Sequence, residues 1–313
     1  MLTSGVVLSP RRHDRVTVRA PAKLNVHLSV GQRRPDGFHD LTTVFQAVGL
    51  YDDVTLTRAD ALTVTVAGPE AAGVPLDDTN LAVRAVRLLA ERTGNEPTVA
   101  VHLVKGIPVA GGCAGGSADA AASLVGCDAL WGTGLTKDEL ASLGAELGSD
   151  VPFSLHGGTA LGTGRGECLT DVLGQGDYSW VLALSDVGLS TPAVYAELDR
   201  QREAGPVGVV TDPAGVLSAL RQADPVALGR ALGNDLQAAA LALLPGLRLL
   251  LDTGRDLGAL GTIVSGSGPT VALLARDDSH AEALAAALSG QGVCSAVRRA
   301  GGPVAGARVV ETA

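Results

Sequence analysis

The amino-acid sequence predicts an α+β protein with two domains. Segments with the two-residue period of strands are mixed with segments of helical period, without the regular alternation of a doubly wound sheet. The chain has 313 residues, 46% of them hydrophobic, a length that suits two domains or one large one and leaves ample apolar surface for sizeable cores. A loop-like stretch at 174–177 separates two such regions. We therefore expect one domain over residues 1–174 and a second over residues 175–313.

The first domain is expected to begin with strands. Residues 1 to about 14 form a loose lead, and RRPDG at 33–37 is typical of a turn. Alternating apolar residues predict strands at 16–30 (interrupted by Pro21), 41–50, 54–57, 62–66 and 98–104, with strand and turns over 157–166. Helical spacing predicts helices over 80–93, over 118–131, and from Thr136, where Glu139 has the spacing of a capping box.

The second domain is expected to start with a strand and then to alternate helices with short strands. Strands are predicted at 180–184, 261–264 and 270–275. Helices are predicted at 193–202, 213–222, 225–232, 236–243 and 281–288. We find no internal repeat and no low-complexity tail.

The net charge argues against two classes of partner. Lys plus Arg number 24 and Asp plus Glu number 33, which gives a net charge of −9. Such a surface repels nucleic acid and anionic membranes on average, so we expect neither as a partner. The most apolar stretch, 236–251, contains Pro245, Gly246 and Arg248 and is not expected to span a bilayer. No signal peptide follows the N-terminal arginines, so we expect a cytoplasmic protein.

The four cysteines, at positions 113, 127, 168 and 294, lack the spacing of a zinc knuckle or a redox CxxC motif. We expect free thiols in a reducing compartment.

A glycine-dense segment, KGIPVAGGCAGGSADAAASL at 105–124, carries the first chemical signal. Glycine lets backbone N–H groups approach a ligand, and a helix that opens directly afterwards adds the positive end of its dipole. The glycines alone are equally compatible with an ordinary flexible loop. The helix start and Ser117 favour phosphate binding, although the pattern is neither a Walker loop nor a Rossmann loop.

Three motifs in order resemble those of the GHMP kinases, the family of galacto-, homoserine, mevalonate and phosphomevalonate kinases. The segment 108–118 resembles the second motif, P-x-x-x-G-L-G-S-S-A-A. PAKLNVHLSVG at 21–31 resembles the first motif, and VSGSGPT at 264–270 resembles the third. The resemblance implies an N-terminal ribosomal-S5-like domain and a C-terminal ferredoxin-like domain, with the active site in the cleft between them.

Three longer segments narrow this resemblance: DGFHDLTTVFQAVGLYDDVTL at 36–56, GSDVPFSLHGGTALGTGRGE at 148–167 and LSTPAVY at 189–195. They are similar to GHMP kinases, particularly actinobacterial ones, that act in the non-mevalonate isoprenoid pathway. Those kinases phosphorylate the 2-hydroxyl of a small-molecule substrate, a cytidine diphosphate-linked methylerythritol, and release ADP. The resemblance covers nearly the whole chain from about residue 16.

The resemblance implies a role for residues in each motif. Asp150 matches the catalytic base, and Lys23 matches the lysine whose charge favours the ionised base and the developing alkoxide. ATP and Mg²⁺ are the implied cofactors, with Ser117 as a candidate Mg²⁺ contact. The implied ATP-binding residues are Pro108, Val109, Ala110, Gly111, Gly112, Cys113, Ala114, Gly115, Gly116, Ser117 and Ala118.

The substrate-binding residues are implied in the same way. Phe38 and Tyr195 match aromatic residues that sandwich the cytosine, and His39 matches the histidine that hydrogen-bonds it. Asn25 and Thr191 are candidates for the methylerythritol hydroxyls.

The sequence departs from the pattern after the second aromatic residue. Some family members have a lysine there, whereas this chain has Ala196, so a diphosphate or ribose contact has to come from elsewhere.

Two alternatives stay open. One is another GHMP kinase, such as a homoserine or sugar kinase, which the DGFH and STPAVY segments disfavour. The other is a catalytically silent ligand sensor, which would lack Lys23 or Asp150. A monomer and a weak homodimer are equally compatible with the sequence.

Overall fold

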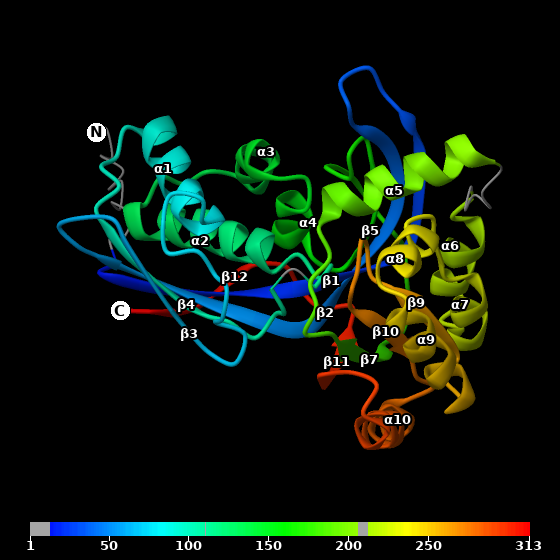
Figure 1. Ribbon diagram of the computed structural model, residues 1–313. Helices are drawn as coiled ribbons and strands as arrows, with labels where there is room; N and C mark the ends of the chain where they lie inside the picture. The colour runs from blue at the N-terminus through cyan, green and yellow to red at the C-terminus, as the bar shows by residue number, and fades with distance from the viewer. Residues whose placement is uncertain (1–12, 110, 206–211) are drawn as a thin grey trace, which may run out of the picture.

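The computed structural model of the protein describes residues 13–109, 111–205 and 212–313, and these form two β-sheets with helices packed against both (Figure 1). The strands are β1 Arg15–Arg33, β2 His39–Arg58, β3 Thr63–Ala67, β4 Val99–Val104, β5 Thr159–Thr163, β6 Cys168–Asp171, β7 Tyr178–Leu184, β8 Gly233–Asn234, β9 Gly261–Val264, β10 Val271–Leu274, β11 Ala296–Gly302 and β12 Arg308–Thr312.

The helices are α1 Leu81–Thr93, α2 Gly115–Trp131, α3 Lys137–Leu147, α4 Val151–His156, α5 Thr191–Ala204, α6 Ala214–Arg221, α7 Pro225–Ala231, α8 Gln237–Leu243, α9 Gly246–Asp256 and α10 Asp278–Gln291. None of the helices in the described part of the chain is long and apolar enough to cross a membrane.

The first sheet has the strand order β12-β1-β2-β4-β3, and it is extended by β5 on β2, β6 on β5 and β8 on β1. Helices α1 to α4 lie together on one side of it (Figure 1). The second sheet has the order β11-β7-β10-β9. The mixed α+β architecture predicted from the sequence is confirmed, and the boundary between residues 174 and 175 stays a prediction.

The long hairpin of β1 and β2 runs through both halves of the molecule (Figure 1). Pro21 does not divide β1 into two strands as predicted; the register shifts between Pro21 and Ala22, and the strand continues. A bulge absorbs the proline because it removes only one donor from the ladder. A second shift follows Asn25, so the ladder is irregular on both sides of Lys23 and Asn25, which re-aims their side chains.

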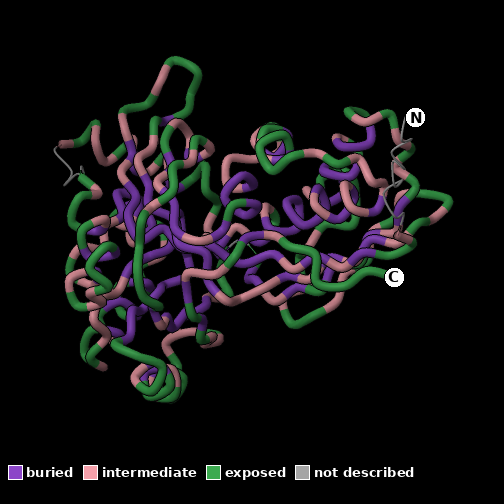
Figure 2. The backbone as a smooth tube through the Cα atoms, turned by 180° about the vertical axis from the view of Figure 1, so that it is seen from behind, coloured by how far each residue is buried: buried purple, intermediate pink, exposed green. Residues whose placement is uncertain are grey.

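Helix α2 is central to the first core. It is rich in alanine and glycine, and side chains around most of its circumference are buried, including Ala118, Ala120, Ala121 and Leu124. Small residues let the helix pack closely on β1 and β2: a Cβ at Gly126 would lie 2.1 Å from the Leu56 side chain. Figure 2 shows the buried residues as a continuous interior beneath an exposed shell.

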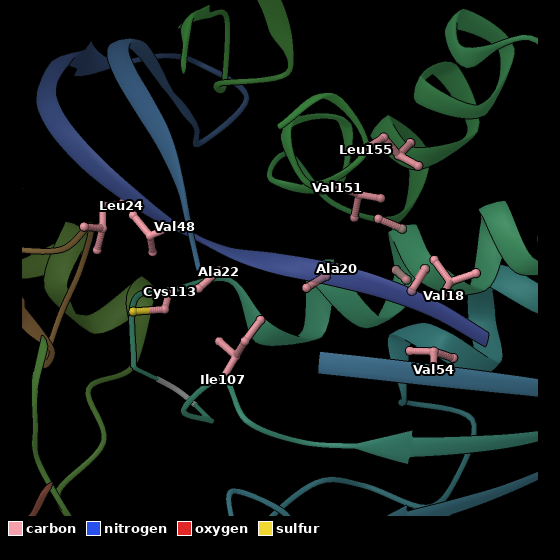
Figure 3. Close-up of a cluster of buried hydrophobic side chains, with 14 of the residues drawn as sticks. Val18, Ala20, Ala22, Leu24, Val48, Val54, Ile107, Cys113, Val151 and Leu155 are labelled. Atoms are coloured by element: carbon pink, nitrogen blue, oxygen red, sulfur yellow. The ribbon is translucent and has the colours of Figure 1, made fainter. Parts of the chain in front are cut away.

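The loop before α2 is anchored in this core from both of its ends. Ile107 and Cys113 are fully buried in the same cluster as Ala20 and Ala22 of β1 (Figure 3). Their apolar side chains face the sheet, which leaves the backbone between them for other contacts.

Several elements were not predicted, namely α4, α9, β6, β8, β11 and β12. Helix α9 overlaps the apolar stretch 236–251, which contains Pro245 and Gly246. In the structure Pro245 is the residue before the helix, where a missing N–H costs nothing, and Leu247, Leu250 and Leu251 form its buried face. Strand β12 pairs antiparallel with β1, and its five residues are all exposed, so it carried no apolar alternation.

Candidate active site

A cavity of about 470 Å³ lies where the glycine-rich loop, β1, the start of α4, the start of α5 and the 264–270 turn meet. We name it the loop cavity. Five residues of the predicted ATP-binding segment line it: Pro108, Gly111, Gly112, Ala114 and Gly115. The helix dipole of α2 points at it, since Ala114 is the N-cap residue and makes no side-chain cap.

The other predicted ATP-binding residues lie around this lining. Val109 is exposed, Cys113 and Ala118 are buried, Gly116 is exposed and Ser117 is half-buried. Ala110 lies outside the described residues. Burial raises the pKa of the Cys113 thiol, which therefore stays protonated at neutral pH.

The 264–270 turn packs backbone to backbone against the glycine-rich loop. Gly112 has a φ of +75°, and a Cβ there would lie 2.2 Å from the Ser265 carbonyl oxygen. The Ser265 hydroxyl donates to the Gly112 carbonyl at 3.1 Å, and the Thr270 N–H donates to the Gly111 carbonyl at 3.3 Å. The second and third motifs therefore form one unit, although about 150 residues separate them along the chain.

The two predicted catalytic residues face each other in the loop cavity. The Lys23 ammonium lies 3.6 Å from the Asp150 carboxylate, and the exposed fractions of the two side chains are 7% and 33%. Asp150 is the residue before α4 and its side chain caps no backbone N–H, so the carboxylate is available to a ligand. Of the residues that line this cavity, Asp150 is the one acid.

Hydrogen bonds fix the Lys23 side chain. Its ammonium donates to Asn25 Oδ1 at 2.5 Å, and Asn25 Nδ2 donates to Thr43 Oγ1 at 2.8 Å. The Thr43 hydroxyl in turn donates to the His27 carbonyl at 2.7 Å. Gly266 packs closely on the Lys23 ammonium, because a Cβ at this position would lie 3.2 Å from Lys23 Nζ. The predicted substrate residue Asn25 thus also holds the lysine in place.

A second cavity, of about 600 Å³, adjoins the first and contains the predicted base-binding residues Phe38, His39 and Tyr195. We name it the aromatic cavity. His39 Nε2 lies 2.8 Å from Asp199 Oδ1, which leaves the other ring nitrogen for a ligand. The rings of His39 and Tyr195 are 5.1 Å apart, whereas the Phe38 ring is half exposed. Burial raises the pKa of Tyr195, so its phenol stays neutral.

The cavities share six lining residues, so one elongated ligand can occupy both: Leu41, Ser149, Arg165, Thr191, Pro192 and Tyr195. Thr191, predicted to contact substrate, is among them, and its hydroxyl lies 2.9 Å from that of Ser267. The sequence interpretation missed Arg165, Ser149 and Asp199. Arg165 and Ser149 lie inside the 148–167 segment, so that segment carried the signal; Asp199 sits one helical turn after Tyr195 on α5.

A buried ionic cluster lies behind the glycine-rich loop. Lys105 Nζ donates to Asp52 and, at 2.6 Å, to Asp119, and the three side chains are at most 4% exposed. Asp52 Oδ1 also accepts the N–H groups of Gly106 and Ile107 at 2.7 and 2.9 Å. Lys105 Nζ reaches the Gly115 carbonyl at 3.3 Å. The cluster therefore joins the start of the loop to the start of α2.

Two carboxylates share one ammonium in this cluster. Burial, with the neighbouring Asp52, raises the pKa of Asp119 to about 8, against the opposing effect of Lys105. Asp119 Oδ1 has no hydrogen-bond partner among the described residues.

The described residues contain no group of three or more His, Cys, Asp or Glu side chains placed to hold a metal ion. A Mg²⁺ ion at this site would therefore have few protein ligands. That is usual for Mg²⁺ bound mainly through phosphates and water.

Comparison with known proteins agrees with this geometry. The sequence pattern described as "GHMP kinases N terminal domain" matches residues 80–158, and that described as "GHMP kinases C terminal" matches residues 216–294. The 4-diphosphocytidyl-2-C-methyl-D-erythritol kinase of Nocardia farcinica is 58% identical to this chain, over 95% of the chain and 96% of the relative. The kinase of that name from Mycobacterium tuberculosis is 54% identical, over 94% and 93%.

Two solved structures resemble the whole fold. A crystal structure of 4-(cytidine 5'-diphospho)-2C-methyl-D-erythritol kinase matches with a TM-score of 0.73 at 32% identity, over 91% of this chain and 98% of the other. A homoserine kinase from Cytophaga hutchinsonii matches with a TM-score of 0.74 at 20% identity, over 99% and 100%. The second likeness shows a shared fold alone.

Proposed function

The chain belongs to the GHMP kinase family, and from this premise we propose how its residues carry out the reaction. It is an ATP-dependent kinase that phosphorylates the 2-hydroxyl of 4-diphosphocytidyl-2-C-methyl-D-erythritol in isoprenoid precursor synthesis. The observation that carries the mechanism is the Lys23–Asp150 pair, which faces the glycine-rich loop within one cavity.

Asp150 is the proposed proton acceptor. A tertiary alcohol is a weak nucleophile at neutral pH, so transfer requires a base within reach and a fixed geometry. The Asp150 carboxylate takes the proton of the 2-hydroxyl as the oxygen attacks the γ-phosphorus of ATP in line with the departing ADP. Lys23, held by Asn25, pairs with Asp150 and stabilises charge on the attacking oxygen and the transferred phosphoryl group.

The backbone of the glycine-rich loop and the first turn of α2 are the proposed ATP-phosphate site. The loop cavity is lined there by backbone with small side chains, so N–H groups can approach the phosphate oxygens directly. Mg²⁺, when bound, would neutralise charge on the phosphates, with the Ser117 hydroxyl as its candidate protein ligand.

The aromatic cavity is the proposed cytidine site. Phe38 and Tyr195 supply ring surfaces, and His39, oriented by Asp199, supplies a hydrogen-bonding nitrogen. Thr191 and Asn25 lie toward the loop cavity, where the methylerythritol hydroxyls would be. A kinase of a biosynthetic pathway that uses ATP is expected in the cytoplasm, and we expect a monomer or a weak homodimer without a nucleic-acid partner.

The function is tested by ADP release with ATP and Mg²⁺, offering three acceptors separately. These are 4-diphosphocytidyl-2-C-methyl-D-erythritol, methylerythritol 4-phosphate and homoserine. We expect turnover of the cytidylated acceptor alone, and loss of that turnover in Asp150→Ala. Turnover of homoserine would keep the kinase chemistry and overturn the assignment of the aromatic cavity. ATP binding without turnover of any acceptor would instead favour a ligand sensor.

A further inference from the structure

Arg165 occupies the neck where the two cavities meet. Six residues line both cavities, and Arg165 is the one charged residue among them; the other five are apolar or carry a hydroxyl group. In a ligand that occupies both cavities, a doubly negative group at the neck therefore has a single guanidinium beside it.

The position of Arg165 is fixed by its turn. It lies in the connection between β5 and β6, between Gly164 and Gly166, and both glycines have positive φ. The Glu167 carboxylate accepts the Arg165 N–H at 2.5 Å, and the Gly164 carbonyl accepts the Leu41 N–H at 2.7 Å. These bonds tie the turn to β2, so Arg165 is directed to the neck by structured backbone.

The guanidinium has hydrogen-bonding capacity to spare. Arg165 Nε lies 3.4 Å from Glu167 Oε1, and the group stands over the Phe38 ring with Cζ 5.3 Å from the ring centroid. Neither of its terminal nitrogens makes a hydrogen bond to another described residue. The side chain is 37% exposed, so an unmatched planar fork faces the neck.

The other cations near the cavities are placed differently. Lys23 lines the loop cavity alone and is engaged with Asn25 and Asp150. Arg33 and Arg200 line the aromatic cavity alone, and Arg200 donates twice to Glu197 at 2.7 Å. The chain has no cation at Ala196, which also lines the aromatic cavity.

We propose that Arg165 binds the diphosphate that joins cytidine to methylerythritol, and so determines specificity for a diphosphate-linked substrate. The inference rests on the proposed function, because that function puts the nucleoside in the aromatic cavity and the reacting hydroxyl beside Asp150. The diphosphate must then cross the neck. Its oxygens match the guanidinium fork, and Glu167 balances the arginine charge when substrate is absent.

The test is a binding series with cytidine, CMP and CDP at constant ionic strength, measured by calorimetry on the full chain and on Arg165→Met. Binding of cytidine serves as the internal control for folding of the aromatic cavity. We expect the wild type to bind CDP more tightly than cytidine, and Arg165→Met to lose about tenfold to a hundredfold in CDP affinity while cytidine affinity stays the same. Arg165→Lys should fall between the two, because it keeps the charge and loses the fork.

Steady-state kinetics separate this role from a general structural one. In Arg165→Met we expect KM for the cytidylated substrate to rise by a similar factor while KM for ATP stays within twofold of the wild-type value. Because Ala196 lines the same cavity, Ala196→Lys in the Arg165→Met background should restore part of the affinity for CDP.

Two results would overturn the inference. One is that Arg165→Met binds CDP more tightly than cytidine by the same factor as the wild type; the other is that Arg165→Met loses affinity for cytidine and CDP equally, which would indicate a structural role. Failure of the proposed function looks different, because the wild type itself would then neither bind cytidine nor turn over the cytidylated substrate.

Discussion

The loop cavity and the aromatic cavity adjoin each other but differ in how much of their walls is backbone and how much is side chain. One wall of the loop cavity is glycine-rich backbone, from the loop before α2 and the 264–270 turn, and a fully buried ionic cluster lies behind it. The aromatic cavity is walled by side chains from the end of the β1–β2 hairpin and from α5, many of them half exposed. The comparison indicates that the shape of the loop cavity depends on the fold of the backbone, whereas the shape of the aromatic cavity can be changed by single side-chain substitutions.

The largest expected effect is on the chemistry of the loop cavity. Asp150→Asn should lower kcat by about 10²-fold to 10⁴-fold, because it removes the proton acceptor while keeping the shape of the side chain. The melting temperature should change only slightly, since the Asp150 side chain caps no backbone group and its ion pair with Lys23 is 3.6 Å long and partly exposed. An activity within tenfold of wild type in ADP release would show that another group accepts the proton.

Loss of a cation should lower the stability of the protein far more beside the loop cavity, where the buried cluster lies, than beside the aromatic cavity. Lys105→Met should lower the free energy of unfolding by about 3–5 kcal/mol, because Asp52 and Asp119 would be left buried without their ammonium. Arg200→Met, which removes an exposed ion pair beside the aromatic cavity, should leave the urea midpoint almost unchanged. Equal losses in the two variants would contradict the comparison.

Backbone packing in the loop cavity is tested by two glycines of similar φ. Gly112→Ala and Gly134→Ala both put a Cβ on a left-handed residue, which costs about 1 kcal/mol. Only the first also meets a neighbour, the Ser265 carbonyl, since nothing lies within 4 Å of a Cβ at Gly134. Gly112→Ala should therefore lose about 1–3 kcal/mol more than the control, with a higher KM for ATP. Matching melting temperatures and ATP kinetics would show that the two motifs are not tightly packed.

A smaller effect is expected in the aromatic cavity. Phe38→Ala should raise KM for the cytidylated substrate by about threefold to tenfold, because it removes one stacking surface. KM for ATP and the melting temperature should stay unchanged, since half of the Phe38 side chain is exposed. Leu76→Ala, at another exposed apolar residue, is the matched control. If KM rose for both ATP and the cytidylated substrate, the result would contradict the assignment of the two substrates to separate cavities.

The smallest effect, for a change of one pH unit, is a pH dependence of stability from the buried cluster. The pKa of Asp119 is raised to about 8 in the folded protein, so the folded state holds this proton over a range in which the unfolded chain has released it. The stability of the folded state therefore falls as pH rises from about 4 to about 8. Asp119→Asn keeps a neutral side chain and should remove this component, which we expect to be about 2 °C in melting temperature per pH unit. Parallel pH profiles of wild type and variant would contradict it.

Sequence reasoning was strongest where function depends on backbone. The glycine-dense pattern and the helix start after it located one wall of the loop cavity, which Gly111, Gly112 and Gly115 line. The α+β class followed from periodicity, and the division into two domains followed largely from the resemblance. The roles of the predicted site residues are proposals that the experiments above test.

Long-range placement could not be read from the chain. Two contacts join residues far apart in sequence: Gly112 packs on Ser265, and Asp199 orients His39. Arg165 lies inside a recognised segment, but its position at the neck depends on the fold. Strand β12 was missed for a related reason. Its residues are exposed, so only its partner β1 defines it as a strand.

The pairing of β12 with β1 has a consequence for the synthesis of the protein. The ribosome makes β1 long before β12, so one edge of the first sheet stays open while the residues between the two strands are made. An open edge is a template for pairing with other chains. A nascent chain stalled before residue 308 should therefore be more prone to aggregate than one that contains β12, even though Lys23 and Asp150, the proposed catalytic residues, have already been translated.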